Sequence, residues 1–226
     1  MLKHFEDAKA YFSFRDISLR VKDLDLKISA GTLRVYLTEA TASGLIHDAG
    51  RGWYSRLSEP LVLDPKPVAK LIRAVAKAFP LLDFTCWSTA QINPFMHHLL
   101  GKNLAFVNTD AEAMDPVWEF MRDAGFDAHL NPRGSAREKF AVREKTVVVR
   151  RRVVGAPAEG HFARIEALLV DLLLETQRLG LMDMGEFQAM ARTAASAGRI
   201  SMSDLAAYAA NRKQVVTDVF GEDWIN

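Results

Sequence analysis

Two arginines stand where a protein could use them to bind a nucleic acid. Arg34 lies in a run of residues with helical spacing, and Arg51 lies between two glycines in the sequence Gly50-Arg51-Gly52. A guanidinium group on an exposed helix can donate two parallel hydrogen bonds to the edge of a guanine in the major groove. An arginine at the tip of a turn can enter the minor groove or neutralise a phosphate. The types and the spacing of these residues therefore indicate contacts with DNA.

The stretch Ser29–Leu57 supplies the elements that would position both arginines. Its first residue, Ser29, is a suitable N-cap, and apolar residues recur at helical spacing over 32–40. Gly44 provides the left-handed conformation that commonly ends a helix, and Leu45–Ile46 is expected to form a short strand before the glycine turn. This order is typical of a recognition helix followed by a two-stranded wing. The residues predicted to contact DNA are Lys27, Ser29, Thr32, Arg34, Val35, Thr38, Arg51 and Arg56.

Two further helices are predicted before this stretch. Met1–Phe12 carries apolar residues on one face and is expected to form the first. Ser13 is a suitable N-cap for the second, Phe14–Val21, and Asp16 stands where the acid of a capping box belongs. Three helices and a hairpin predict a winged helix-turn-helix DNA-binding domain over residues 1–59.

A linker is predicted at residues 60–67, because three prolines in this stretch stop a helix from continuing. Residues 68–226 are expected to form a second domain, in which helices and strands alternate before a helical tail. The predicted helices are 68–79, 90–100 and 115–124, and the predicted strands are 81–85, 103–107, 128–130 and 146–150. From Glu159 the pattern is helical to the end, and Ser201–Asp204 is a capping sequence for a late helix. The predicted fold class is α+β, with an N-terminal winged helix-turn-helix, a small α/β domain and a helical C-terminal tail.

The charge of the chain is unevenly distributed. The formal net charge is only +1, which argues against a strongly basic protein that binds nucleic acids generally, and residues 1–59 hold nine Lys and Arg against eight Asp and Glu. Between Asn131 and Val154, eight cations stand against two acids, a local charge of +6. The cations of this basic segment are Arg133, Arg137, Lys139, Arg143, Lys145, Arg150, Arg151 and Arg152. The basic segment could extend a DNA footprint, bind RNA, a nucleotide or an acidic partner, or be a solvated basic hairpin.

The sequence contains no recognisable catalytic motif. His97 and His98 are adjacent, so on a helix they would diverge and could not easily share a metal, and no glycine-rich phosphate loop is present. Asp83 could bind a metal in a nuclease, but in Glu138-Lys139 and Glu144-Lys145 the acid and the lysine would point to opposite faces of a strand. We therefore expect a protein without enzymatic activity, metal site or cofactor, with a metal-dependent nuclease as the enzymatic alternative.

The single cysteine and the absence of long apolar runs indicate the compartment. Cys86 has no second cysteine with which to form a disulfide, which suits a reducing environment. No run approaches the roughly 18 apolar residues that a membrane span needs, and the N-terminus lacks the apolar core of a signal peptide. The expected localisation is cytoplasmic, without membrane contact.

Three stretches make the chain similar to a known family. Residues 44–54 resemble the arginine–glycine turn that follows the recognition helix of the AbiEi abortive-infection regulators, the antitoxins of type IV toxin–antitoxin systems. Thr85–Ala90 is similar to their strand and following helix start, and Glu166–Leu173 is similar to the late helix that follows their basic β-hairpin. The resemblance implies an N-terminal domain that binds inverted repeats in its own promoter and represses its operon. It also implies a C-terminal region that counteracts a nucleotidyltransferase toxin without requiring a stable complex.

The expected function is that of a DNA-binding transcriptional regulator, and the resemblance implies that this regulator is an antitoxin. Its expected partners are double-stranded operator DNA and a nucleotidyltransferase toxin. The alternative from another class is a protein–protein adaptor whose winged helix does not bind DNA. Binding to phosphates releases counterions, so DNA affinity that falls steeply with salt distinguishes the regulator from the adaptor.

Overall fold

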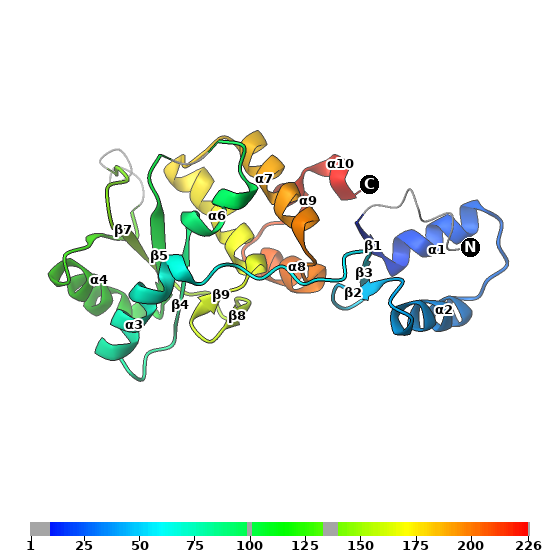
Figure 1. The fold of residues 1–226 in the computed structure, drawn as a ribbon, viewed down its shortest axis with the longest axis horizontal. Helices are drawn as coiled ribbons and strands as arrows, with labels where there is room; N and C mark the ends of the chain where they lie inside the picture. The colour runs from blue at the N-terminus through cyan, green and yellow to red at the C-terminus, as the bar shows by residue number, and fades with distance from the viewer. Residues whose placement is uncertain (1–9, 99–100, 133–139, 226) are drawn as a thin grey trace.

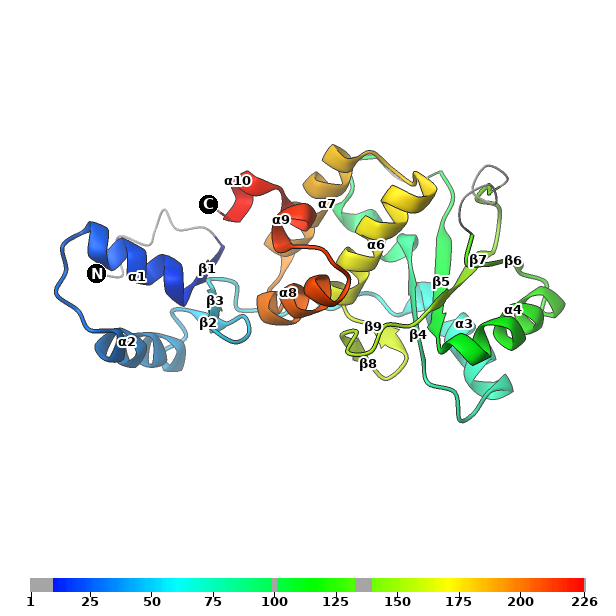
Figure 2. The same cartoon turned by 180° about the vertical axis from the view of Figure 1, so that it is seen from behind.

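The computed structural model describes residues 10–98, 101–132 and 140–225, which form an elongated molecule of the α+β class. Figure 1 shows a small N-terminal unit at one end, a sheet flanked by helices at the other end, and the C-terminal helices between them. Figure 2 shows the same order from behind. Of the predicted helix Met1–Phe12, residues 1–9 lie outside the described part of the chain.

The N-terminal unit, residues 10–59, contains a three-stranded antiparallel sheet and two helices. Its strands are β1 (Tyr11–Ser13), β2 (His47–Asp48) and β3 (Trp53–Ser55), in the order β1-β3-β2, and its helices are α1 (Phe14–Asp23) and α2 (Ala30–Ala42). The prediction of a helix through Tyr11 and Phe12 is wrong, because both residues pair with β3. Successive strand residues point to opposite faces, so Tyr11 reaches the main core of the protein while Phe12 joins the small core of the N-terminal unit.

The local signals at the ends of α1 and α2 are confirmed. Ser13 and Asp16 form the predicted capping box, and the Ser29 side chain accepts a hydrogen bond from the Thr32 amide at 3.1 Å. Gly44 follows the end of α2 with φ +73°. The strand predicted at Leu45–Ile46 is displaced, because Ile46 is buried in the small core and the pairing with β3 begins at His47.

The larger sheet contains six strands in the order β6-β7-β5-β4-β9-β8. The strands are β4 (Phe84–Ser88), β5 (Leu104–Thr109), β6 (Asp127–Leu130), β7 (Thr146–Arg151), β8 (Ala158–Glu159) and β9 (Phe162–Ala163). β5, β7 and β6 are mutually parallel, and β4 runs antiparallel to β5. The sheet is therefore mixed, and three neighbouring strands end at the same edge.

Helices cover both faces of this sheet. α3 (Lys66–Ala78) and α4 (Met114–Asp123) pack on one face against alternate strand residues such as Val147 and Val149. The intervening Val148 points to the other face and joins the core formed around α6 (Ile165–Leu179). The remaining helices are α7 (Met184–Ala197), α8 (Met202–Asn211), α9 (Val216–Phe220) and α10 (Glu222–Ile225).

Two predicted segments of the second domain are corrected. In place of a helix over 90–100, the chain forms two short 3-10 turns, Thr89–Gln91 and Asn93–Phe95, with residues 99–100 outside the described part. A capping box between Ser88 and Gln91 opens the first turn, and Pro94 in the second has no amide proton with which to continue a helix. The chain after Glu159 is not helical at once, because β9 and its antiparallel pairing with β8 precede α6.

α6 is the central helix of the molecule. Twelve consecutive residues, from Ile165 to Thr176, are buried, so the helix is covered on every side. Three of these buried residues are acids: Glu166, Asp171 and Glu175. A buried carboxylate is tolerated only with ionic or hydrogen-bonding partners, so these acids constrain what must pack around α6.

The N-terminal unit is attached to the segment between α7 and α8. The Tyr11 hydroxyl donates to the Gly198 carbonyl at 3.0 Å and accepts from the Ile200 amide at 2.9 Å. The Met202 amide donates to the Ala49 carbonyl at 2.7 Å, which joins the start of α8 to the β2–β3 turn. The two bonds of Tyr11 are buried and connect residues almost 190 positions apart in the sequence.

No helix of the described residues is long and apolar enough to cross a lipid bilayer.

Replacing Tyr11 with Phe should lower the free energy of unfolding by about 1–3 kcal/mol, because it leaves a buried carbonyl and a buried amide without their partner. The midpoint of urea unfolding measures this loss. Tyr36→Phe is the matched control, because the Tyr36 side chain is exposed on α2. Equal midpoints for the two variants would contradict the attachment through Tyr11.

The contribution of the Tyr11 hydroxyl to the free energy of unfolding should also depend on pH. Burial raises the pKa of Tyr11 from 10.0 to about 12, so the folded protein retains the phenolic proton over a range in which the unfolded chain loses it. The stability difference between wild type and Tyr11→Phe should be constant below pH 10 and should shrink as the pH rises from 10 to 12.

Candidate functional site

The residues predicted to contact DNA are exposed on the N-terminal unit. Leu33, Leu37 and Ala40 bury one side of α2 in the small core. The opposite side carries Val35 and Thr38, and Arg34 and Thr32 lie on its two flanks. Lys27, Ser29, Thr32, Arg34, Val35, Thr38, Arg51 and Arg56 are all exposed.

Phe14 contacts both Arg34 and the turn that carries Arg51. The guanidinium carbon of Arg34 lies 4.8 Å from the centroid of the Phe14 ring, a cation–π contact. The Phe14 amide donates to the Gly52 carbonyl at 2.8 Å, and Gly52 is the neighbour of Arg51. The structure therefore brings the arginine of α2 and the arginine of the β2–β3 turn close to the same aromatic residue.

The hydroxyl groups on α2 already have partners within the helix. Ser29 Oγ lies 2.9 Å from Thr32 Oγ1 and caps the first turn. Thr38 Oγ1 donates to the Arg34 carbonyl at 2.9 Å. In the pair of Ser29 and Thr32 only one hydroxyl donates to the other, so one O–H of the pair remains available as a donor. Arg34 offers several donors from one side chain, so it is the stronger candidate for reading a base edge.

The two described strands next to the basic segment, β6 and β7, run parallel, so they do not form a hairpin with each other. Arg133, Arg137 and Lys139 lie outside the described residues. Arg143, Lys145 and Arg151 are exposed.

Two further cations of the basic segment are not available as a surface patch. Arg150 is buried and forms an ion pair with Glu175 of α6, and it also donates to the side chain of Asn131 at 2.8 Å. Arg152 is paired with Asp83 and with Asp110. The alternation of strand residues sends Arg150 and Arg151 to opposite faces of the sheet, which explains why one is buried and the other is not.

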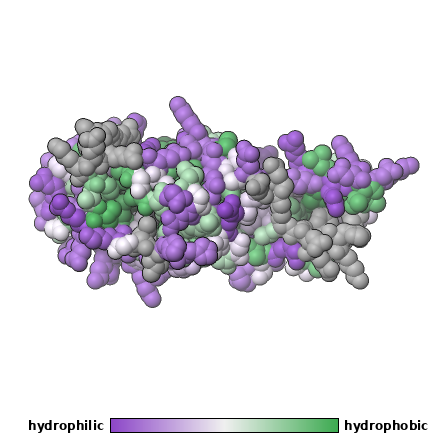
Figure 3. Space-filling view, turned by 90° about the horizontal axis from the view of Figure 1, so that it is seen from above, coloured by the Kyte–Doolittle hydropathy of each residue, from purple (hydrophilic) through white to green (hydrophobic). Residues whose placement is uncertain are grey.

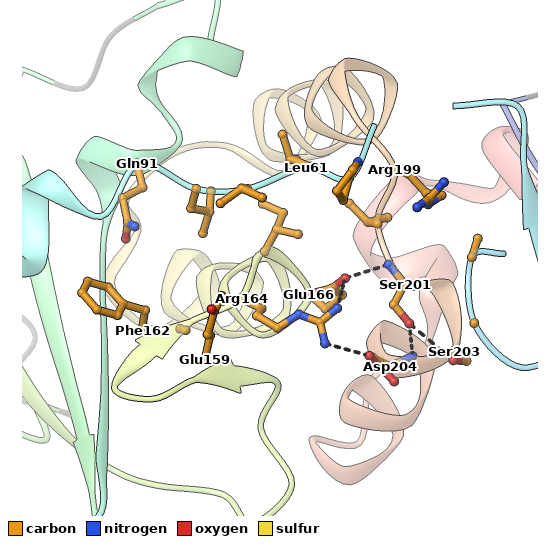
Figure 4. A pocket seen from close by; sticks show the side chains of 18 of the residues that line it. Leu61, Gln91, Glu159, Phe162, Arg164, Glu166, Arg199, Ser201, Ser203 and Asp204 are labelled. Carbon is orange, nitrogen blue, oxygen red and sulfur yellow. Dashed lines mark hydrogen bonds and ion pairs between the residues drawn. The ribbon is translucent and has the colours of Figure 1, made fainter. Parts of the chain in front are cut away.

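A cavity of about 750 Å³ lies at the junction between the N-terminal unit and the rest of the molecule. The β2–β3 turn, the residues predicted as linker, the start of α6 and the start of α8 line this junction cavity. Figure 4 shows Arg164 bridging the carboxylates of Glu166 and Asp204, with Ser201 alongside. Because the walls belong to both parts, a shift of the N-terminal unit against α8 would change the shape of the cavity.

Glu166 is the most unusual group in this junction cavity. Its side chain is almost fully buried, and Oε1 accepts from Arg164 at 3.0 Å and from the Ser201 amide at 2.7 Å. Among the described residues, Oε2 has no hydrogen-bond partner. It is therefore an acceptor that suits a hydroxyl or amine donor. Glu166 was not among the predicted site residues, although the acids at positions 166, 171 and 175 of a mostly apolar helix are a readable signal.

Two described side chains bear on possible catalytic chemistry, Cys86 and Asp83. Burial raises the pKa of the Cys86 thiol well above its ordinary value, so the thiol stays protonated and is a poor nucleophile. Asp83, the candidate metal ligand, is paired with Arg152. Among the described residues, no group of three or more His, Cys, Asp and Glu gathers as a metal site would require.

The chain combines a mixed α+β architecture with an exposed helix beside a hairpin and a central helix that carries buried acids. It belongs to a family described as "family of unknown function (DUF6577)", whose model matches residues 32–219. That range runs from α2 to α9 and includes the β2–β3 turn, the whole larger sheet and the junction cavity. No curated protein matches the sequence.

Replacing Gly50 with Ala should weaken the attachment of the N-terminal unit to α8. A Cβ at Gly50 would lie 2.1 Å from Ser203 Oγ and 2.8 Å from Ser203 Cβ, so the two parts must move apart. We expect the free energy of unfolding to fall by about 1–3 kcal/mol more than in Gly52→Ala. This difference between the two variants is the cost of overpacking alone. Gly52 is the matched control, because its φ is also positive and its Cβ would meet nothing within 4 Å.

Hydrogen exchange at the Met202 amide, which bonds to the Ala49 carbonyl, reports on this attachment directly. Faster exchange in Gly50→Ala than in Gly52→Ala is the expected result. Identical exchange in the two variants would mean that the turn does not hold the N-terminal unit in place.

Proposed function

We propose that the protein is a DNA-binding transcriptional regulator whose N-terminal unit is a winged helix-turn-helix. Under this proposal α2 is the recognition helix, and the hairpin of β2 and β3 is the wing. The protein represses its own operon and acts as the antitoxin of a type IV toxin–antitoxin system, counteracting a nucleotidyltransferase toxin.

The order of elements in the N-terminal unit supports this proposal. α1 is followed by a turn, by α2 and by the β2–β3 hairpin, and β3 pairs on its other edge with β1. A recognition helix must keep one side free to enter the major groove while its other side is packed. α2 meets this requirement, because Leu33 and Leu37 are buried while Arg34, Val35 and Thr38 are exposed.

The observation that carries the proposal is the meeting of Arg34, Phe14 and the Gly52 turn. The contact with Phe14 holds the Arg34 guanidinium beside α2, so less side-chain entropy is lost when it binds a base. Arg51 stands at the adjoining turn, where it can contact a phosphate or the minor groove. Since the N-terminal region is nearly neutral, its DNA affinity must come from such placed side chains rather than from bulk charge.

A protein–protein adaptor is the second candidate, and exposed apolar side chains favour it. Six of the eleven exposed large apolar side chains of the described residues belong to the N-terminal unit: Leu19, Leu24, Leu26, Val35, Tyr36 and Leu45. Figure 3 shows apolar areas among the hydrophilic surface both at this end and over the sheet. Clustered apolar side chains are a common sign of protein contacts.

Replacing Arg34 with Ala should weaken binding to the DNA upstream of the protein's own gene by about 1–3 kcal/mol and relax sequence preference. Arg34→Lys keeps the charge but loses the paired donors, so it should restore non-specific affinity without restoring the preference. Arg51→Ala should weaken binding to all DNA sequences evenly. It should also reduce the magnitude of the slope of log affinity against log salt concentration by about 1. Fluorescence anisotropy with cognate and scrambled duplexes measures all three.

Arg73→Ala is the control for these variants, because Arg73 is exposed on α3 at the far end of the molecule and should leave binding unchanged. If Arg34→Ala and Arg51→Ala bind like wild type, the assignment of the recognition helix is wrong. If wild type binds no DNA at any salt concentration, the adaptor replaces the regulator. Plasmid cleavage that requires magnesium or manganese would instead identify a nuclease.

Co-expression tests the antitoxin part of the proposal. The wild-type protein should restore growth of cells that express the nucleotidyltransferase encoded beside its gene from an unrelated promoter. Arg34→Ala should restore growth equally well, because the second activity is attributed to residues 68–226 and not to DNA binding. Failure of the wild type to restore growth would remove the antitoxin activity while leaving the DNA-binding proposal standing.

A further inference from the structure

A second cavity lies where three parallel strands of the larger sheet end. Asn108 and Arg150 stand near the carboxyl ends of β5 and β7, and Asn131 follows β6. α6 and the end of α8 supply the other walls, and the volume is about 470 Å³. This volume is typical of sites for small molecules, and the carboxyl edge of parallel strands is where α/β proteins bind their ligands. We call it the strand-end cavity.

The walls of the strand-end cavity carry an excess of positive charge. Six of its lining residues are cations: Arg150, Arg151, Arg152, Arg178, Arg212 and Lys213. Two lining residues, Asp171 and Glu175, are acids, and Arg152 is also paired with Asp83 and Asp110, so two positive charges remain in excess. An anion that enters this cavity is therefore favoured by the field of its walls.

The two acids are occupied within the protein. Glu175 accepts from Arg150 and, at 2.9 Å, from Arg178. Asp171 accepts from Tyr208 at 2.9 Å and from Asn108 at 3.1 Å, and it lies 3.2 Å from Arg212. These bonds hold three guanidinium groups in fixed positions, so a ligand does not have to order them.

Two aromatic side chains form the inner wall of the strand-end cavity. Trp87 is fully buried and stacks on Phe106 with ring centroids 4.0 Å apart.

We propose that the strand-end cavity binds a small organic phosphate, such as a nucleotide or a sugar phosphate. At neutral pH a phosphate monoester presents mainly acceptor oxygens, and the arginines carry only donors. Arg151 and Lys213 are exposed at the rim of the cavity, and neither has an ion-pair partner among the described residues. They supply the charge that the internal pairs leave available.

Isothermal titration of the full-length protein tests this proposal. The titrants are inorganic phosphate, pyrophosphate, a nucleoside monophosphate and a nucleoside triphosphate, with the unphosphorylated nucleoside and citrate as comparisons. At least one phosphate compound should bind at one site per chain, more tightly than citrate, and the nucleoside should not bind.

The double variant Arg151→Ala/Lys213→Ala should weaken that binding by at least about tenfold, because it removes two charge-assisted contacts. Its stability should match that of wild type, since both side chains are exposed. Lys70→Ala/Arg73→Ala is the matched control, because it removes one exposed lysine and one exposed arginine from α3 and should leave the affinity unchanged.

Three results would overturn the proposal. They are no binding of any phosphate compound by wild type, equal affinity in wild type and Arg151→Ala/Lys213→Ala, and binding restricted to a single-stranded oligonucleotide without terminal phosphate. The last result would assign the cations to a nucleic-acid backbone rather than to a small ligand. None of these results bears on the N-terminal unit, whose DNA binding is measured separately with Arg34→Ala.

Discussion

The fold depends on the ion-pair and hydrogen-bond partners of three carboxylates that are buried on α6. Glu166, Asp171 and Glu175 of α6 each find them in elements far from α6 in the sequence. The Ser201 amide, at the start of α8, donates to Glu166. Tyr208 of α8 and Arg212, which follows α8, contact Asp171, and Arg150 of β7 pairs with Glu175. An unpaired buried charge costs several kcal/mol, so α6 is stable in its buried position only when the sheet and α8 are assembled around it.

This arrangement makes α6 the common wall of the two cavities. Glu166 borders the junction cavity, and Asp171 and Glu175 border the strand-end cavity about one and a half and two and a half turns further along the helix. α8 also serves both, because its start receives the N-terminal unit and its end closes the strand-end cavity. The proposed DNA-binding unit and the proposed phosphate site are thus attached to the same pair of helices, which share a buried network of ion pairs.

The basic segment shows why charge along a sequence does not translate directly into charge on a surface. Its local charge of +6 is divided among different environments once the chain folds. Arg150 neutralises a buried acid, Arg152 pairs with two acids from other segments, and Arg151 remains exposed. Adjacent residues on a strand point to opposite faces, so one run of arginines supplies a core ion pair and a cavity rim at the same time.

The sequence by itself determined the features that depend on neighbours within a few residues. The capping box of Ser13, the cap at Ser29, the end of α2 at Gly44 and the turn at Gly50–Gly52 follow from local backbone preferences. The α+β class, α3 and α4 follow from periodicity, and the exposed positions of Arg34 and Arg51 follow from both.

Only the tertiary structure decided the features that require residues distant in the sequence. Tyr11 and Phe12 are strand residues because both pair with β3, and Tyr11 also bonds to Gly198, far away in the sequence. The parallel course of β6 and β7 is set by their pairing within the sheet. The burial of Arg150, the contact of Arg34 with Phe14 and both cavities likewise depend on contacts between separate elements. Such contacts are selected by the packing of the whole chain, so no local pattern of residue types encodes them.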